Sequence, residues 1–87
     1  MDEKMEKRLG FVGIIIDNRK ESAAKVNEVL SMFGDLIAVR VGIPYLKKKC
    51  CVITLVVDAT TDELGALTGK LGLIKGVSVK SALGKEK

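Results

Sequence analysis

Four stretches of this chain have the composition of β-strands, and three of them are apolar on both alternate sets of positions. The first, residues 9–16, reads LGFVGIII, and the third, residues 50–58, reads CCVITLVVD. A sheet with one face in water should alternate apolar and polar residues along each strand. The sequence therefore predicts a sheet with two apolar faces, and its two predicted helices can cover only one of them. We expect the other face to meet a ligand or another subunit.

Two segments between the strands have apolar residues at helical spacing. The first helix is expected to begin after Asn18, which would form a capping box with Glu21, and to end before Gly34, a residue free to take positive φ. The second is expected to begin at Thr60, with Glu63 as its capping-box partner. The two apolar stripes are Ala23, Val26, Leu30 and Phe33 in the first helix, and Leu64, Leu67, Leu71 and Ile74 in the second.

The second and third strands are expected to form a hairpin around a basic turn at residues 46–49. Pro44 should end regular pairing there, because proline has no N–H to donate. The last strand, residues 77–82, follows a turn at Gly76. The second strand covers residues 36–42, and its pattern places Ile37, Val39, Val41 and Ile43 on one face and Arg40 on the other.

The order strand–helix–strand–strand–helix–strand predicts an α+β fold. With right-handed crossovers it gives a ferredoxin-like βαββαβ sandwich, a four-stranded antiparallel sheet with two helices on one face. We expect residues 9–83 to form a single domain, with a flexible lead-in at 1–8 and a flexible tail at 84–87. This fold serves regulatory, catalytic, RNA-binding and metal-binding domains, so it does not choose a function.

Length and composition favour self-association. The chain has 87 residues, of which 47% are hydrophobic, and its mean hydropathy is +0.23. A domain of this size buries only roughly 60% of its unfolded surface. An oligomer, dimer or tetramer, accommodates so apolar a small chain better than a monomer does.

Charge and cysteine content limit the partners and the compartment. The net charge of +4 is spread over both termini, a turn and helix surfaces, and the predicted sheet offers no aromatic platform for bases, so we expect no direct nucleic-acid binding. The charged N-terminus has no signal-peptide core, and no apolar run is long enough to span a membrane. Cys50 and Cys51 are adjacent, so they would point to opposite faces of a strand and could not easily pair. We expect a cytoplasmic protein.

The absence of histidine argues against catalytic and metal sites. Neither a Ser/His/Asp nor a Cys/His arrangement is available, so we expect no enzyme and no catalytic residue. An acylphosphatase-like site would place Asp17, an anion, beside the phosphate. For metals, the Cys50–Cys51 pair lacks Cys-x-x-Cys spacing, and no metal or other cofactor is expected. A redox role for Cys50, which follows three lysines, stays open as a weaker alternative.

Three glycines in the second helical segment, Gly65, Gly69 and Gly72, require an explanation, because each costs about 1 kcal/mol relative to alanine. Close packing against the sheet or a neighbouring subunit is the favoured explanation. The alternative is contact with an anion or ligand through Thr68 and Lys70.

Several short runs resemble one family along nearly the whole chain. They are RLGFVGI at 8–14, RVGIPY at 40–45, the acidic Asp58-x-Thr60-x-Asp62-Glu63, LTGKLG at 67–72 and GVSVKS at 76–81. In this order they resemble the iron-only hydrogenase system regulators. The resemblance implies a single ACT-like domain, similar to the C-terminal ligand-sensing domain of nickel-responsive regulators, and a role in hydrogenase maturation.

The chain departs from the nickel-responsive regulators in two respects. It has no histidine, so their metal site cannot be transferred to it, and the residues before the first strand are too few for a ribbon-helix-helix DNA-binding domain. Such a protein would act through a protein partner.

By resemblance to ACT-type domains, a small molecule would bind at a subunit interface near the loop after the first strand. On this chain that region comprises Gly13, Asp17, Asn18 and Arg19. Asp17 would meet an amine and Arg19 a carboxylate, and the free N–H groups at the helix start would favour an anion. The alternative is a solvated, capped turn. Secondary candidates for ligand binding are Arg40, Tyr45 and Asn27.

The sequence therefore predicts a regulatory domain that forms a homo-oligomer and senses a small-molecule effector or acts through a partner protein. The main alternative is a purely structural oligomerisation or protein-interaction module. An acylphosphatase-like enzyme is a distant third.

Overall fold

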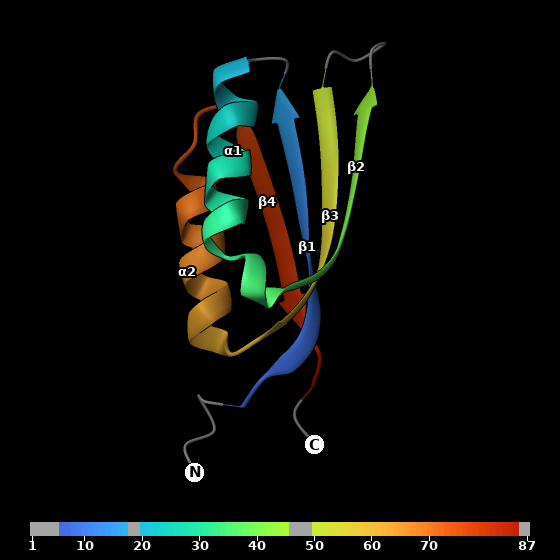
Figure 1. The fold of residues 1–87 in the computed structure, drawn as a ribbon, viewed down its shortest axis with the longest axis vertical. Coiled ribbons are helices and arrows are strands. Elements are labelled where there is room, and N and C mark those ends of the chain that lie inside the picture. The colour runs from blue at the N-terminus through green and yellow to red at the C-terminus, as the bar shows by residue number, and fades with distance from the viewer. Residues whose placement is uncertain (1–5, 18–19, 46–49, 86–87) are drawn as a thin grey trace.

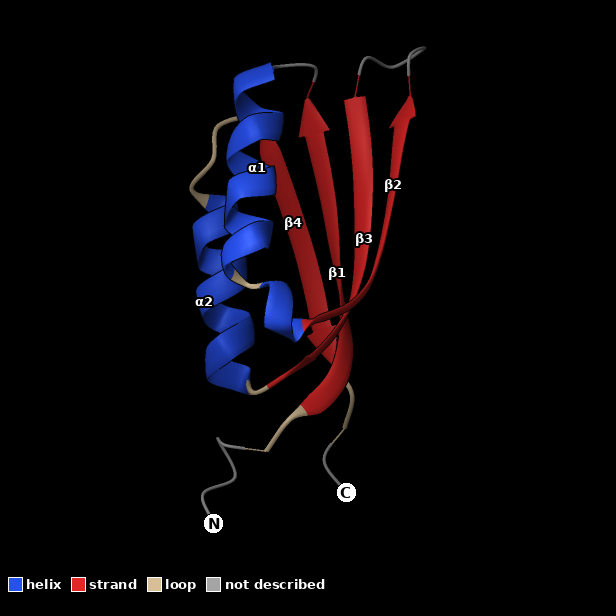
Figure 2. Cartoon of the chain, in the orientation of Figure 1, coloured by secondary structure: helices blue, strands red, loops and turns tan. Residues whose placement is uncertain are grey.

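The computed structural model describes residues 6–17, 20–45 and 50–85, which form two layers, a sheet and a pair of helices (Figures 1 and 2). The elements in chain order are β1 Arg8–Asp17, α1 Lys20–Met32, a 3-10 turn Gly34–Leu36, β2 Ile37–Tyr45, β3 Cys50–Ala59, α2 Thr61–Gly72 and β4 Val77–Leu83. Asn18 and Arg19 lie outside the described residues, so the predicted Asn18 cap stays a prediction.

The sheet has the strand order β2-β3-β1-β4, and every neighbouring pair is antiparallel. Both helices lie on the same side of it (Figure 1). This is the predicted ferredoxin-like α+β sandwich, which is therefore confirmed. The two central strands, β1 and β3, carry the most apolar runs in the sequence, and β2 and β4 form the edges.

The core fills the space between the sheet and the helices. The apolar stripes of both helices point into it, as the three-four-three spacing predicted. Its fully buried side chains with the largest volumes are Ile14, Ile16, Leu55, Leu67, Leu71, Val12, Val26 and Val57. The predicted outward positions of α1, among them Lys25 and Glu28, are exposed. The alternation along β1 and β3 thus directs one set of side chains into this core and the other set away from it.

Strand β2 differs from its prediction at both ends. A bulge between Ile37 and Val39 turns Ile37 toward the core, opposite Val57, whereas Val39 lies opposite Val56 on the other face. Ile37 therefore does not share a face with Val39, because a bulge inserts one unpaired residue and reverses the alternation. Pairing also continues through Pro44 to Tyr45, so the prediction that Pro44 ends it is wrong. An edge strand tolerates proline, since one of its sides has no partner strand.

The two predicted glycine turns have different outcomes. Gly76 has a φ of 82° and turns the chain into β4 as predicted. Gly34 does not adopt positive φ; it begins the 3-10 turn that follows α1, so the predicted left-handed helix end is wrong. The tighter turn directs buried Leu36 into the core directly before β2 begins.

The start of α2 has the predicted capping box. The Thr60 hydroxyl accepts from the Glu63 N–H at 3.1 Å, and the Glu63 carboxylate accepts from the Thr60 N–H at 2.9 Å. That backbone hydrogen bond, aided by Lys7 at 3.6 Å, lowers the pKa of Glu63 below its ordinary value, although partial desolvation opposes the shift. The cap thus fixes the N-terminal end of α2, and the ion pair with Lys7 connects it to the residue before β1.

Candidate functional site

The sheet face away from the helices carries a continuous group of exposed apolar side chains. Register places these residues side by side on β2, β3 and β1. Their exposed fractions lie between 38% and 64%. We call this group the open face, and it consists of Leu9, Phe11, Ile15, Val39, Val41, Ile43, Val52 and Val56. A contiguous exposed apolar patch commonly marks an interaction site.

Gly13 lies within the open face. On β1 it stands between Phe11 and Ile15, and its neighbours across the sheet are Thr54 on β3 and Lys80 on β4. Because it has no side chain, the surface is lower there than at the residues on either side. Among the candidate ligand residues whose side-chain positions the structure describes, Gly13 alone lies within the apolar surface, away from the strand ends.

Asp17, at the end of β1, faces the same side of the strand as Gly13. Its backbone N–H donates to the Gly76 carbonyl at 3.0 Å, and its carboxylate fills the space that a Cβ on Gly76 would need. The neighbouring candidates Asn18 and Arg19 lie outside the described residues, so their role in ligand binding stays a prediction.

Arg40 and Asn27 meet on the helix side of the sheet. The Arg40 Nη2 donates to the Asn27 Oδ1 at 2.5 Å, which links edge strand β2 to α1. The structure therefore joins two of the secondary candidates but places them on the opposite face from Gly13. Tyr45 ends β2 opposite Cys50, and its side chain lies outside the described part of the chain.

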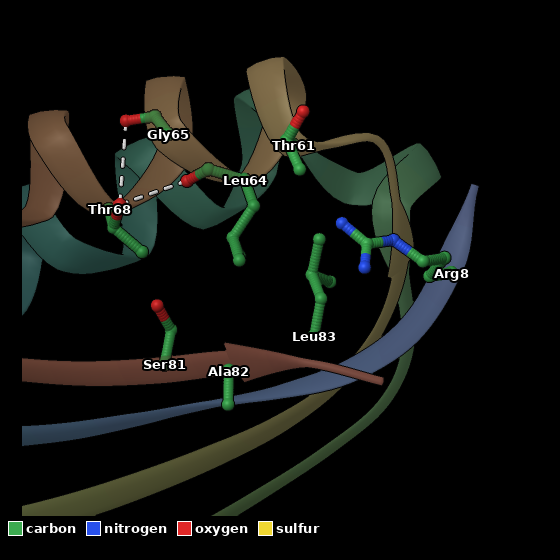
Figure 3. A pocket seen from close by; sticks show the side chains of 8 residues that line it. All are labelled: Arg8, Thr61, Leu64, Gly65, Thr68, Ser81, Ala82 and Leu83. Atoms are coloured by element: carbon green, nitrogen blue, oxygen red, sulfur yellow. Dashed lines mark hydrogen bonds between the residues drawn. The ribbon is translucent and has the colours of Figure 1, made fainter. Parts of the chain in front are cut away.

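A cleft of about 470 Å³ opens between α2, the end of β4 and the start of β1. The Arg8 guanidinium points into it at one end, and the Ser81 hydroxyl points into it from the sheet (Figure 3). The Leu64 and Leu83 side chains lie between them. Sequence reasoning missed this site, because it assigned Arg8 to the lead-in and placed Ser81 in the last strand without a ligand role. The signal available in the sequence was the alternative explanation of the helix glycines, ligand contact through Thr68, because Thr68 and Gly65 both line this cleft.

The glycines of α2 do not pack against the sheet. Apart from adjacent residues and the backbone of α2 itself, no atom of the described chain lies within 4 Å of a Cβ built at Gly65, Gly69 or Gly72. The expectation of close packing on the sheet is therefore wrong, and contact with a neighbouring subunit stays a prediction. The alternative explanation was contact with an anion or ligand through Thr68 and Lys70. The structure separates these two residues, because Thr68 lines the cleft whereas Lys70 lies on the side of α2 that faces α1.

The described residues contain no group of three or more metal-ligating side chains. Cys50 and Cys51 are unpaired and half-buried, and their register places them on opposite faces of the sheet, as expected. No helix in the described ranges has the length and apolar character needed to cross a bilayer.

Residues 8–81 match a family model described as "TM1266-like: Iron-only hydrogenase system regulator, putative". Among solved structures, the uncharacterized protein TM1266 from Thermotoga maritima is similar, with 40% sequence identity and a TM-score of 0.90. That match covers 92% of this chain and 100% of the other. No curated protein sequence matches this chain.

Two more distant structures share the fold. The ACT domain from the GTP pyrophosphokinase of Chlorobium tepidum is 23% identical with a TM-score of 0.75, and the match covers 87% of this chain and 99% of that domain. The C-terminal domain of the MgtC protein from Mycobacterium tuberculosis is 18% identical with a TM-score of 0.69. That match covers 97% of this chain and 93% of the MgtC domain. Both likenesses concern the ACT-like fold alone.

Proposed function

The chain belongs to the TM1266-like family of iron-only hydrogenase system regulators, and from this membership and the open face we propose that it is a regulatory domain that works as a homo-oligomer. It senses a small-molecule effector or acts through a protein partner, without catalysis of its own and without direct contact to nucleic acid. Its proposed location is the cytoplasm. The subunits associate through the open face, as a dimer or tetramer.

The open face is the observation that carries this proposal. Eight large apolar side chains lie on it, each partly exposed, while the alternate side chains of the two central strands point the other way and are buried under the helices: Val12, Ile14 and Ile16 on β1, and Ile53, Leu55 and Val57 on β3. Full burial of an exposed large apolar side chain contributes roughly 1.5–3 kcal/mol, and these side chains, already partly buried in the monomer, would each contribute a part of that at an interface. A second copy offers the same flat aliphatic surface, and two such surfaces can pack across a two-fold axis.

The proposed effector site includes Gly13 and Asp17, together with Asn18 and Arg19. In a face-to-face oligomer, the low surface at Gly13 would be enclosed by the partner, and the strand end at Asp17 would lie at the rim of the interface. Arg40 is a weaker candidate, because its hydrogen bond to Asn27 gives it a structural role. Tyr45, at the end of the adjacent strand, is retained as a candidate from the resemblance alone.

Native mass spectrometry of protein purified without added ligand tests the proposal. We expect an oligomer that carries additional small-molecule mass. An Ile15→Lys variant should be a monomer, because the interface would have to bury an unpaired charge. Leu73→Lys is the matched control: Leu73 is 87% exposed but lies on the helix layer, so this variant should assemble normally.

The outcomes also separate the alternative function. An oligomer without bound mass, through repeated purifications, would favour a purely structural oligomerisation module. A wild-type monomer at micromolar concentration would overturn the proposal.

A further inference from the structure

The cleft between α2 and β4 has the composition of a small-molecule site, with two polar ends and an apolar middle. Arg8 supplies the charge at one end, and Ser81 supplies a hydroxyl toward the other (Figure 3). The Thr68 hydroxyl donates back to the Leu64 carbonyl at 3.0 Å, so Thr68 lines the cleft with its methyl group. Between them lie Leu64, which is buried, and Leu83, which is half-buried. Ligand sites in proteins commonly combine an apolar lining with a few converging polar groups.

Arg8 is a cation without a counter-charge in the described chain. Its one hydrogen bond there runs from Nη1 to the Gly84 carbonyl at 2.8 Å. A guanidinium has five N–H donors, so most of them are available to a ligand. The carboxylate of Glu63, next to the cleft residue Leu64 in the sequence, is engaged by the Thr60 N–H and by Lys7. No acidic residue lines the cleft, which therefore favours an anion.

Gly65 leaves the side of the cleft formed by α2 open, because it has no side chain. It lies in the interior of α2, where glycine costs about 1 kcal/mol relative to alanine, and no atom of the described chain uses the space that a Cβ would occupy. Gly65 lines the cleft directly. Room for a ligand is a physical reason to retain glycine there, whereas internal packing is not.

We propose that this cleft binds a small aliphatic carboxylate, with the carboxylate on Arg8 and the hydrocarbon body between Leu64 and Leu83. A planar guanidinium binds a carboxylate with two parallel hydrogen bonds. The apolar middle of the cleft selects a ligand with a hydrocarbon body over a bare inorganic anion. The proposal rests on the proposed regulatory function and names the class of its effector, at a site separate from Gly13 and Asp17.

Amide chemical-shift mapping on the full ¹⁵N-labelled chain tests it, with hexanoate as the probe, hexanamide as its uncharged counterpart and inorganic phosphate as the bare anion. Hexanoate should shift the amides of Gly65, Thr68 and Ser81 in a saturable manner. Hexanamide and phosphate should each bind at least about tenfold more weakly, since each lacks one of the two interactions.

Two variants of α2 provide a matched pair. Gly65→Ala should raise the melting temperature, because alanine favours the helix, yet weaken hexanoate binding about tenfold by narrowing the cleft. Gly69→Ala should raise the melting temperature similarly and leave binding unchanged, since Gly69 does not line the cleft. Arg8→Gln should abolish the preference for hexanoate over hexanamide.

Three results would overturn the proposal: no saturable shift at the cleft amides at millimolar hexanoate, shifts confined to the open face, or equal effects of the two glycine variants on binding. The oligomeric state, measured by diffusion in the same samples, is independent of these readouts. An assembled protein that does not bind hexanoate would overturn this site and leave the proposed function intact.

Discussion

The side chains of Arg40 and Asn27 are joined by a hydrogen bond that connects edge strand β2 to helix α1. Both groups are exposed, so water competes for the same donors and acceptors. A hydrogen bond to a charged group in such a position typically contributes about 1 kcal/mol or less. Among the residues that the structure describes, no other side-chain hydrogen bond joins β2 to the helix layer.

Replacing either partner should therefore loosen the edge strand slightly. We expect Arg40→Ala and Asn27→Ala each to lower the free energy of unfolding by about 0.5–1 kcal/mol, and the double variant to lower it by less than the sum. Urea denaturation of the four proteins measures the coupling. Strictly additive losses would mean that the hydrogen bond contributes nothing to stability.

The capping box predicts a specific pH dependence. The folded pKa of Glu63 lies below its ordinary value of 4.5, so the folded state holds this proton less tightly than the unfolded state does. The stabilisation is therefore present above the unfolded pKa and is lost as pH falls through the folded pKa. Thermal unfolding should show wild type more stable than Glu63→Gln at neutral pH, with the difference disappearing in acid. A difference that grew in acid would contradict this assignment.

The turn at Gly76 should tolerate no side chain. Its φ of 82° disfavours L-residues, and an added Cβ would collide with the Asp17 carboxylate. Gly76→Ala should lower the free energy of unfolding by about 1–3 kcal/mol. In the double variant Gly76→Ala/Asp17→Ala, the part of this loss that comes from the collision should be recovered, whereas the part that comes from the positive φ should remain. Urea denaturation of the variants measures both free energies of unfolding. Full recovery would mean that backbone strain is negligible there.

Much of the fold follows from local patterns in the sequence. The stripes Val26–Leu30 and Leu64–Leu67–Leu71 identified the buried helix faces, because helical spacing and burial repeat together. The double apolar character of the β1 and β3 sequences identified the open face, since no predicted element remained to cover it. The Thr60–Glu63 cap was predictable because both partners lie within one turn.

Features that depend on relations between distant elements could not be predicted in this way. The bulge after Ile37 depends on how β2 docks beside β3, and its apolar neighbours fit either register. The cleft brings Arg8 and Ser81 together from opposite ends of the chain, and neither residue stands out in its own segment. The hydrogen bond between Arg40 and Asn27 could not be foreseen either, although both residues were candidates.

Association through the open face should make thermal stability depend on protein concentration, because an oligomer is stabilised by mass action. We expect the wild-type melting temperature to rise with concentration. Val41→Thr keeps the size and strand preference of the side chain but adds a hydroxyl to the open face. In dilute solution, where both proteins are monomers, this variant should have the same melting temperature as wild type. In concentrated solution its melting temperature should be lower than that of wild type. A melting temperature independent of concentration, or an equal deficit of Val41→Thr at every concentration, would show that the open face stays in water.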